Sequence, residues 1–74
     1  MTYPVFRKLD GFERFYKITD DRNFLEAYRS QGVIKYLAVK AVQFPEILRI
    51  QDMIECQFSF APMTPEEVIE YFPE

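Results

Sequence analysis

The sequence VIKYLAVKAV, residues 33–42, decides the fold of this chain. It is rich in β-branched residues and is bounded by Gly32 and Pro45, a combination that predicts a β-strand. A strand that is apolar on both faces is typically covered on two sides, so we expect a central position in a sheet. The alternation of side chains gives those faces: Val33, Leu37 and Val39 with Lys35 on one, and Ile34, Tyr36, Ala38 and Val42 with Lys40 on the other.

The two lysines of this strand fall on opposite faces and need an explanation. Either Lys40 lies at an exposed end of the strand, or a bulge between Lys35 and Lys40 changes the register and places both in water.

A hairpin is predicted ahead of this strand. Asp10-Gly11 suits a type I′ turn and separates PVFRKL from FERFYKI. In the second of these arms Tyr16 and Ile18 alternate with charged residues, as in a half-buried strand, whereas Phe15 stands among charges on the outward face. We expect Phe15 to belong to an uncovered apolar face of the sheet, because a neighbouring strand also places apolar groups on that face.

Residues 24–30, FLEAYRS, allow two interpretations. They alternate as a strand would, but a short helix that pairs Phe24 with Tyr28 and stops at Gly32 is also possible. We favour the strand, because Gln31-Gly32 stands at hairpin spacing before residues 33–42.

The remainder of the chain has a helical period. In residues 45–56 Pro45 suits the first helical position, and the apolar residues Ile47, Ile50, Met53 and Ile54 form one stripe. A second helix begins with a capping box, in which Thr64 is the N-cap and Glu67 its partner, and it ends before Pro73.

Strands followed by helices predict a single small α+β domain over residues 1–74. Its expected architecture is an antiparallel β-meander of three to four strands followed by two C-terminal helices packed on one face. Two short helices would cover only one face of such a sheet. The other face then needs a partner, since a chain of 74 residues buries only about 60% of its unfolded surface.

The composition argues against enzymatic chemistry. The chain has no His, one Cys and two Gly, so neither a zinc site of the usual spacing nor a phosphate-binding glycine loop can be built. The lone Cys56 is expected to be a small buried residue. We therefore expect no catalytic residues, no metal and no cofactor.

The chain is expected to be cytoplasmic and to have no membrane contact. Its first ten residues, MTYPVFRKLD, lack the pattern of a signal peptide, and no apolar run approaches the ~18–20 residues of a membrane span. A single thiol also suits a reducing compartment.

The function expected first is protein interaction, most directly a homodimer or a complex with another protein subunit, through the uncovered sheet face or a strand edge. Charge raises a second hypothesis, because residues 1–49 hold all nine basic residues against six acids and residues 50–74 hold six acids alone. Basic residues among aromatics can bind single-stranded nucleic acid, although the net charge of −3 counts against it. The candidate interaction residues are Arg14, Phe15, Lys17, Tyr28, Lys35 and Tyr36.

A third hypothesis is a small-ligand site between sheet and helices. Tyr16, Tyr28 and Tyr36 would supply its polar anchors, although an aromatic stripe at strand spacing is more often core.

Overall fold

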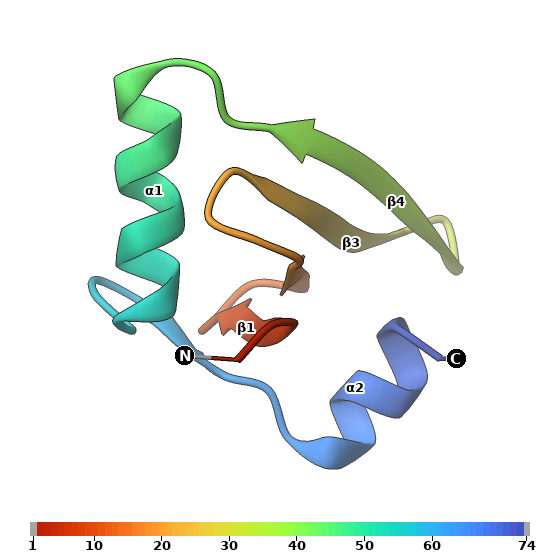
Figure 1. Ribbon diagram of the computed structural model, residues 1–74. Helices are drawn as coiled ribbons and strands as arrows, with labels where there is room; N and C mark the ends of the chain where they lie inside the picture. The colour runs from red at the N-terminus through yellow and green to blue at the C-terminus, as the bar shows by residue number, and fades with distance from the viewer. Residues whose placement is uncertain (1, 74) are drawn as a thin grey trace.

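The computed structural model describes residues 2–73, which form a five-stranded antiparallel sheet and two helices (Figure 1). The strand order across the sheet is β4-β3-β2-β1-β5. The predicted α+β class, an antiparallel meander followed by two C-terminal helices, is confirmed. The elements in chain order are β1 (Val5–Leu9), β2 (Arg14–Ile18), β3 (Asn23–Ser30), β4 (Val33–Lys40), α1 (Phe44–Ile54), β5 (Phe60–Pro62) and α2 (Pro65–Tyr71).

The two hairpins use different turns. Gln31 and Gly32 both have positive φ, 53° and 78°, and join Ser30 to Val33 as a two-residue turn. This hairpin makes residues 24–30 a strand, so the helical alternative is wrong. The first hairpin is also present, but Leu9 pairs with Arg14, which leaves a four-residue loop over 10–13. Of that loop only Gly11 has positive φ, so the predicted type I′ turn is wrong.

The helices lie on opposite faces of the sheet, which corrects the expectation that both pack on one. We call these the α1 face and the α2 face. Figure 1 shows the chain leaving α1, running along the sheet edge as β5 and reaching α2 beyond it. Because β5 pairs with the outer side of β1, it carries the chain around the edge from one face to the other.

Each face has its own core. The α1 core joins three strands to α1 through the buried residues Val5, Tyr16, Ile18, Phe24, Ala41, Ile50 and Met53. The α2 core is smaller and consists of Phe15, Ala27, Tyr71 and Phe72, with Phe6, Leu25, Ile34 and Met63 packed against it.

The strand at residues 33–40 was expected to be central, but it forms one edge of the sheet. It is apolar on both faces for a reason other than a central position. Val39 packs on the α1 core and Ile34 on the α2 core, so each face is partly covered by a different helix at a different end of the strand. Most of the strand remains exposed. Pairing with β3 is continuous from Asn23↔Lys40 to Ser30↔Val33, so neither lysine depends on a bulge.

Local signals set the helix ends. At α2 the Thr64 Oγ1 accepts the Glu67 backbone N–H at 3.2 Å, and Glu67 Oε1 accepts the Thr64 N–H at 2.9 Å, as the capping box predicted. The short β5 was not predicted, because three residues that include Pro62 give no alternating pattern.

Candidate interaction surface

The outer edge of β4 presents unpaired backbone groups. In an antiparallel ladder, hydrogen-bonded and non-hydrogen-bonded pairs alternate, so one bond fixes the pattern for the whole strand. The Ala41 N–H donates to the Arg22 carbonyl at 2.6 Å, in the same register as the β3–β4 pairs. The odd-numbered residues of β4 therefore turn their N–H and C=O groups towards β3. The residues that turn theirs away from the sheet are Ile34, Tyr36, Ala38 and Lys40.

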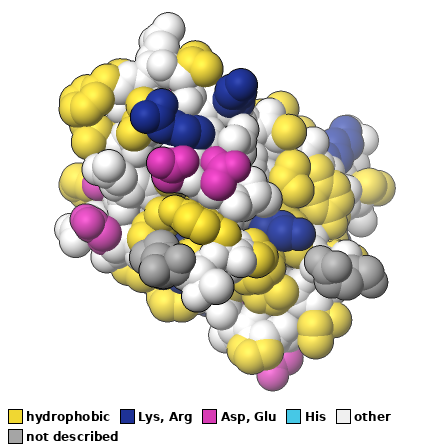
Figure 2. Space-filling model, viewed as in Figure 1, with side chains coloured by type: hydrophobic (Ala, Val, Ile, Leu, Met, Phe, Trp, Pro, Cys, Tyr) yellow, Lys and Arg dark blue, Asp and Glu magenta, His cyan; other side chains and the backbone are white. Residues whose placement is uncertain are grey.

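Side chains along this edge are exposed and largely apolar. Val33, Leu37 and Tyr36 keep 58%, 53% and 48% of their surface accessible, and the chain that follows β4 exposes Val42 and Phe44 further, at 68% and 70%. Figure 2 shows hydrophobic side chains reaching the surface over the region where β4 lies, beside a basic one. The β4 edge thus combines free hydrogen-bonding groups with apolar surface, and it carries Lys35 and Lys40 but no acid.

The opposite edge of the sheet is much shorter than the β4 edge. It is formed by β5, which has three residues and ends in Pro62, a residue without an N–H. Short edge strands and proline are common means by which proteins prevent unwanted strand pairing. Of the two edges of the sheet that residues 2–73 form, only the β4 edge has the length and the free donors of a pairing template.

Three of the six predicted interaction residues come together on the α1 face. Arg14 is the register partner of Tyr28, and Tyr28 is the partner of Lys35, so these three form a row across β2, β3 and β4. The Arg14 guanidinium lies 5.3 Å from the centre of the Tyr28 ring and 3.1 Å from the Glu26 carboxylate. Glu26 is 8% exposed, so part of the positive charge of this row is neutralised within the protein.

Phe15 is not on an uncovered face, and that expectation is wrong. Its ring stacks on Tyr71 with the centroids 3.9 Å apart, and only 6% of its surface is accessible to solvent. The alternation correctly predicted that Phe15 lies on the face opposite Tyr16, but α2 covers that face.

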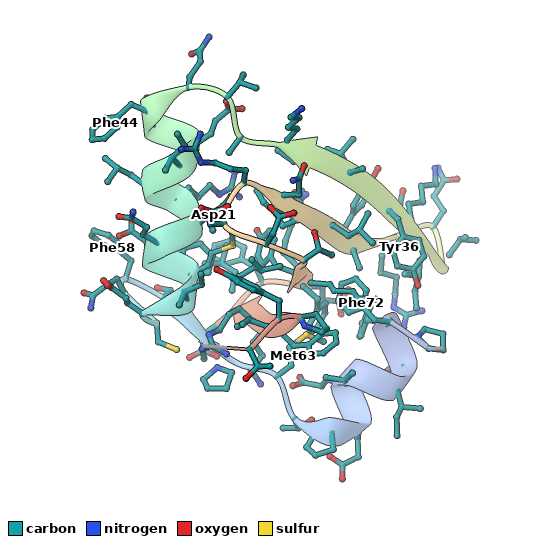
Figure 3. All side chains as sticks on the ribbon, in the orientation of Figure 1. Asp21, Tyr36, Phe44, Phe58, Met63 and Phe72 are labelled. Atoms are coloured by element: carbon teal, nitrogen blue, oxygen red, sulfur yellow. The ribbon has the colours of Figure 1, made fainter. Side chains whose placement is uncertain are left out.

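Lys17 and Tyr36 lie on the α2 face, away from the Arg14–Tyr28–Lys35 row. With Leu25, Phe72 and Pro73 they line a shallow pocket of about 270 Å³. The Tyr36 hydroxyl donates to the Tyr71 carbonyl, and its ring lies 6.0 Å from that of Phe72 (Figure 3). Tyr36 therefore connects β4 to the end of α2, while its backbone faces away from the sheet.

The three tyrosines proposed as ligand anchors do not share a pocket. Tyr16 is 1% exposed in the α1 core, where its hydroxyl accepts a hydrogen bond from Arg49 at 3.2 Å. Burial and the nearby Glu26 carboxylate raise the pKa of the Tyr16 hydroxyl. Because Tyr28 shares the α1 face and Tyr36 points to the other, these three hydroxyls do not come together for one ligand.

Within residues 2–73, no three side chains of His, Cys, Asp or Glu gather as a metal site. None of the helices in this part of the chain combines the length and apolar character that crossing a membrane would require.

Of the outward-facing residues of β4, Tyr36 was among the interaction residues predicted from the sequence, whereas Ile34, Ala38 and Lys40 were not. Side-chain alternation does not reveal which backbone groups are free. The two-residue turn at Gln31-Gly32 holds that information, because a hydrogen-bonded pair flanks such a turn. It could be used only once β4 was known to be an edge.

Comparison with known proteins adds no relative: no protein-family model, no curated protein and no solved structure matches this chain.

Proposed function

We propose that this chain is a small, non-enzymatic interaction domain that binds an extended strand of a protein along the outer edge of β4. The observation that carries the proposal is the run of outward N–H and C=O groups at Ile34, Tyr36, Ala38 and Lys40. Strand addition satisfies such groups and is a recurrent mode of protein recognition.

The other surfaces support this choice. Each sheet face is already partly covered by a helix of the chain itself, and the β5 edge is short and ends in proline. The exposed Val33 and Leu37 on the α1 face and Tyr36 on the α2 face would pack on the side chains of an added strand.

Amide hydrogen exchange tests the proposal directly, because alternate residues of β4 should respond differently. The probes are the protein itself at rising concentration and an excess of a synthetic peptide of alternating Thr and Val. The amides of Ile34, Tyr36, Ala38 and Lys40 should slow at least tenfold when either probe binds. Those of Lys35 and Leu37 should be protected from the start, because they pair with β3. Protection gained elsewhere, or at no position with either probe, would overturn the proposal.

A second candidate function rests on the Arg14–Tyr28–Lys35 row. A cation on each side of an aromatic ring resembles the stacking platforms that bind single-stranded nucleic acid. Anisotropy of a labelled single-stranded oligonucleotide over a salt series tests it. Phosphate contacts should make the affinity fall steeply with salt. Loss of the stacking ring in Tyr28→Ala should also weaken binding. No binding at low salt would eliminate this candidate.

A further inference from the structure

We infer that the strand bound at the β4 edge is β4 of a second copy, running antiparallel, with a two-fold axis at Leu37. This inference rests on the proposed function and names its partner and register. Three features of the edge support it: the outward backbone groups, the placement of the two lysines and the exposed apolar residues.

Backbone hydrogen bonding selects the register. A two-fold axis perpendicular to the sheet places one residue of β4 opposite its own copy and keeps each face continuous across the interface. With the axis at Leu37, Tyr36 lies opposite Ala38 of the second copy, and Ile34 lies opposite Lys40. All the outward residues of β4 then face outward residues of the other strand. An axis at Tyr36 would place Lys40 opposite the turn residue Gly32, and an axis at Ala38 would place Ile34 beyond the end of the other strand.

The lysines are compatible with this pairing. Lysines on an edge strand usually oppose association, because a symmetric pair can bring like charges together. Lys35 and Lys40 have opposite parity, so they lie on different faces and cannot oppose each other in a two-fold pair. With the axis at Leu37, Lys35 faces Val39 and Lys40 faces Ile34. Neither lysine meets its own copy.

The apolar residues complete the argument. Leu37, 53% exposed, would lie opposite itself on the α1 face. Val33 would lie opposite Ala41, which leads directly into the exposed Val42 and Phe44 of the second copy. A dimer would also supply stabilisation to a domain whose core is split into two small clusters.

The contact between Leu37 and its own copy, which this register alone would create, provides the test. Leu37 with its copy would form a non-hydrogen-bonded pair with Cα atoms about 4.5 Å apart, within the range that a disulfide spans. Lys35 is the matched control, since it is exposed, on the same face and also of odd number. Its copy would lie about 13 Å away along the strand, from about 3.3 Å per residue. All variants carry Cys56→Ser, so that the native thiol does not contribute.

Under mild oxidation Leu37→Cys should convert to a covalent dimer at least tenfold faster than Lys35→Cys, with the uncrosslinked protein dimeric by light scattering. A disulfide that forms only when the two variants are mixed would move the axis to Tyr36 and overturn this register. A wild-type chain that stays monomeric at high concentration would overturn the second copy as partner. In that case, protection of the outward β4 amides by the Thr–Val peptide would leave the proposed function standing.

Discussion

The Arg7 side chain caps the C-terminal end of α1, and its Nε donates to the Met53 carbonyl at 3.0 Å. Its Nη2 donates to the Ile54 carbonyl, also at 3.0 Å. The last turn of α1 contains no basic residue of its own, so strand β1 supplies the positive charge that the helix end favours. One guanidinium thus connects the start of the sheet to residues at the end of α1 that lie 46 and 47 positions later in the chain.

Replacing Arg7 should therefore destabilise the domain. Arg7→Met removes both capping hydrogen bonds and should cost at least about 1.5–3 kcal/mol, the usual contribution of a single hydrogen bond from a charged group. Arg7→Lys should recover only part of this loss, because an ammonium cannot present the planar fork that reaches both carbonyls. Urea unfolding followed by circular dichroism measures the change.

Arg22→Met is the control for Arg7, because Arg22 is an exposed turn residue whose side chain caps no helix. If Arg7→Met proves as stable as Arg22→Met, the capping contact contributes nothing to stability.

Phe15→Ala should unfold the α2 side of the molecule. It removes a ring that is 6% exposed and stacked on Tyr71, and buried phenylalanine truncations cost about 3–5 kcal/mol. That loss is comparable to the whole stability of a domain this small. Phe12→Ala is the matched control, because Phe12 is 65% exposed in the neighbouring loop. Equal thermal midpoints for the two variants would contradict the packing of α2 on this face.

The contrast between Phe15 and β4 shows how far the sequence could predict the molecule. Local signals were sufficient for the four strands of the meander and for both helices, since the turn at Gln31-Gly32 and the capping box at Thr64 act over a few residues. Which element covers which face depends on β5, whose three residues redirect the chain around the sheet edge. Without β5, two helices on one face and a central β4 were the simplest assembly. Arg14, Tyr28 and Lys35 were chosen individually, and only the register of three strands made them neighbours.

The capping box of α2 should make stability depend on pH. The Thr64 backbone N–H, and after it Lys8, hold the pKa of Glu67 below its ordinary value of 4.5. A carboxyl whose pKa is lower in the folded state stabilises the fold above the unfolded pKa. That contribution is lost as the pH falls through the folded pKa.

Glu67→Gln keeps a capping side chain but removes this titration. The difference in unfolding free energy between wild type and Glu67→Gln should be below about 1 kcal/mol near pH 7, because the ion pair with Lys8 is screened by solvent. It should shrink as the pH falls from about 6 to about 3. A difference that grows on acidification would contradict the assignment.

Proline can separate the two sides of β4, because neighbouring residues direct their N–H groups oppositely. Ala38 points its N–H away from the sheet, so Ala38→Pro should leave the monomer folded while removing a donor from the interface. Leu37 pairs with Glu26 of β3, so Leu37→Pro should break the ladder and lower the stability of the monomer itself.

Light scattering over a dilution series should show association at least tenfold weaker for Ala38→Pro, with an unchanged circular dichroism spectrum. If Ala38→Pro associates like the wild type, the outer edge of β4 is not the interface. If it unfolds, the direction assigned to the N–H groups of β4 is reversed.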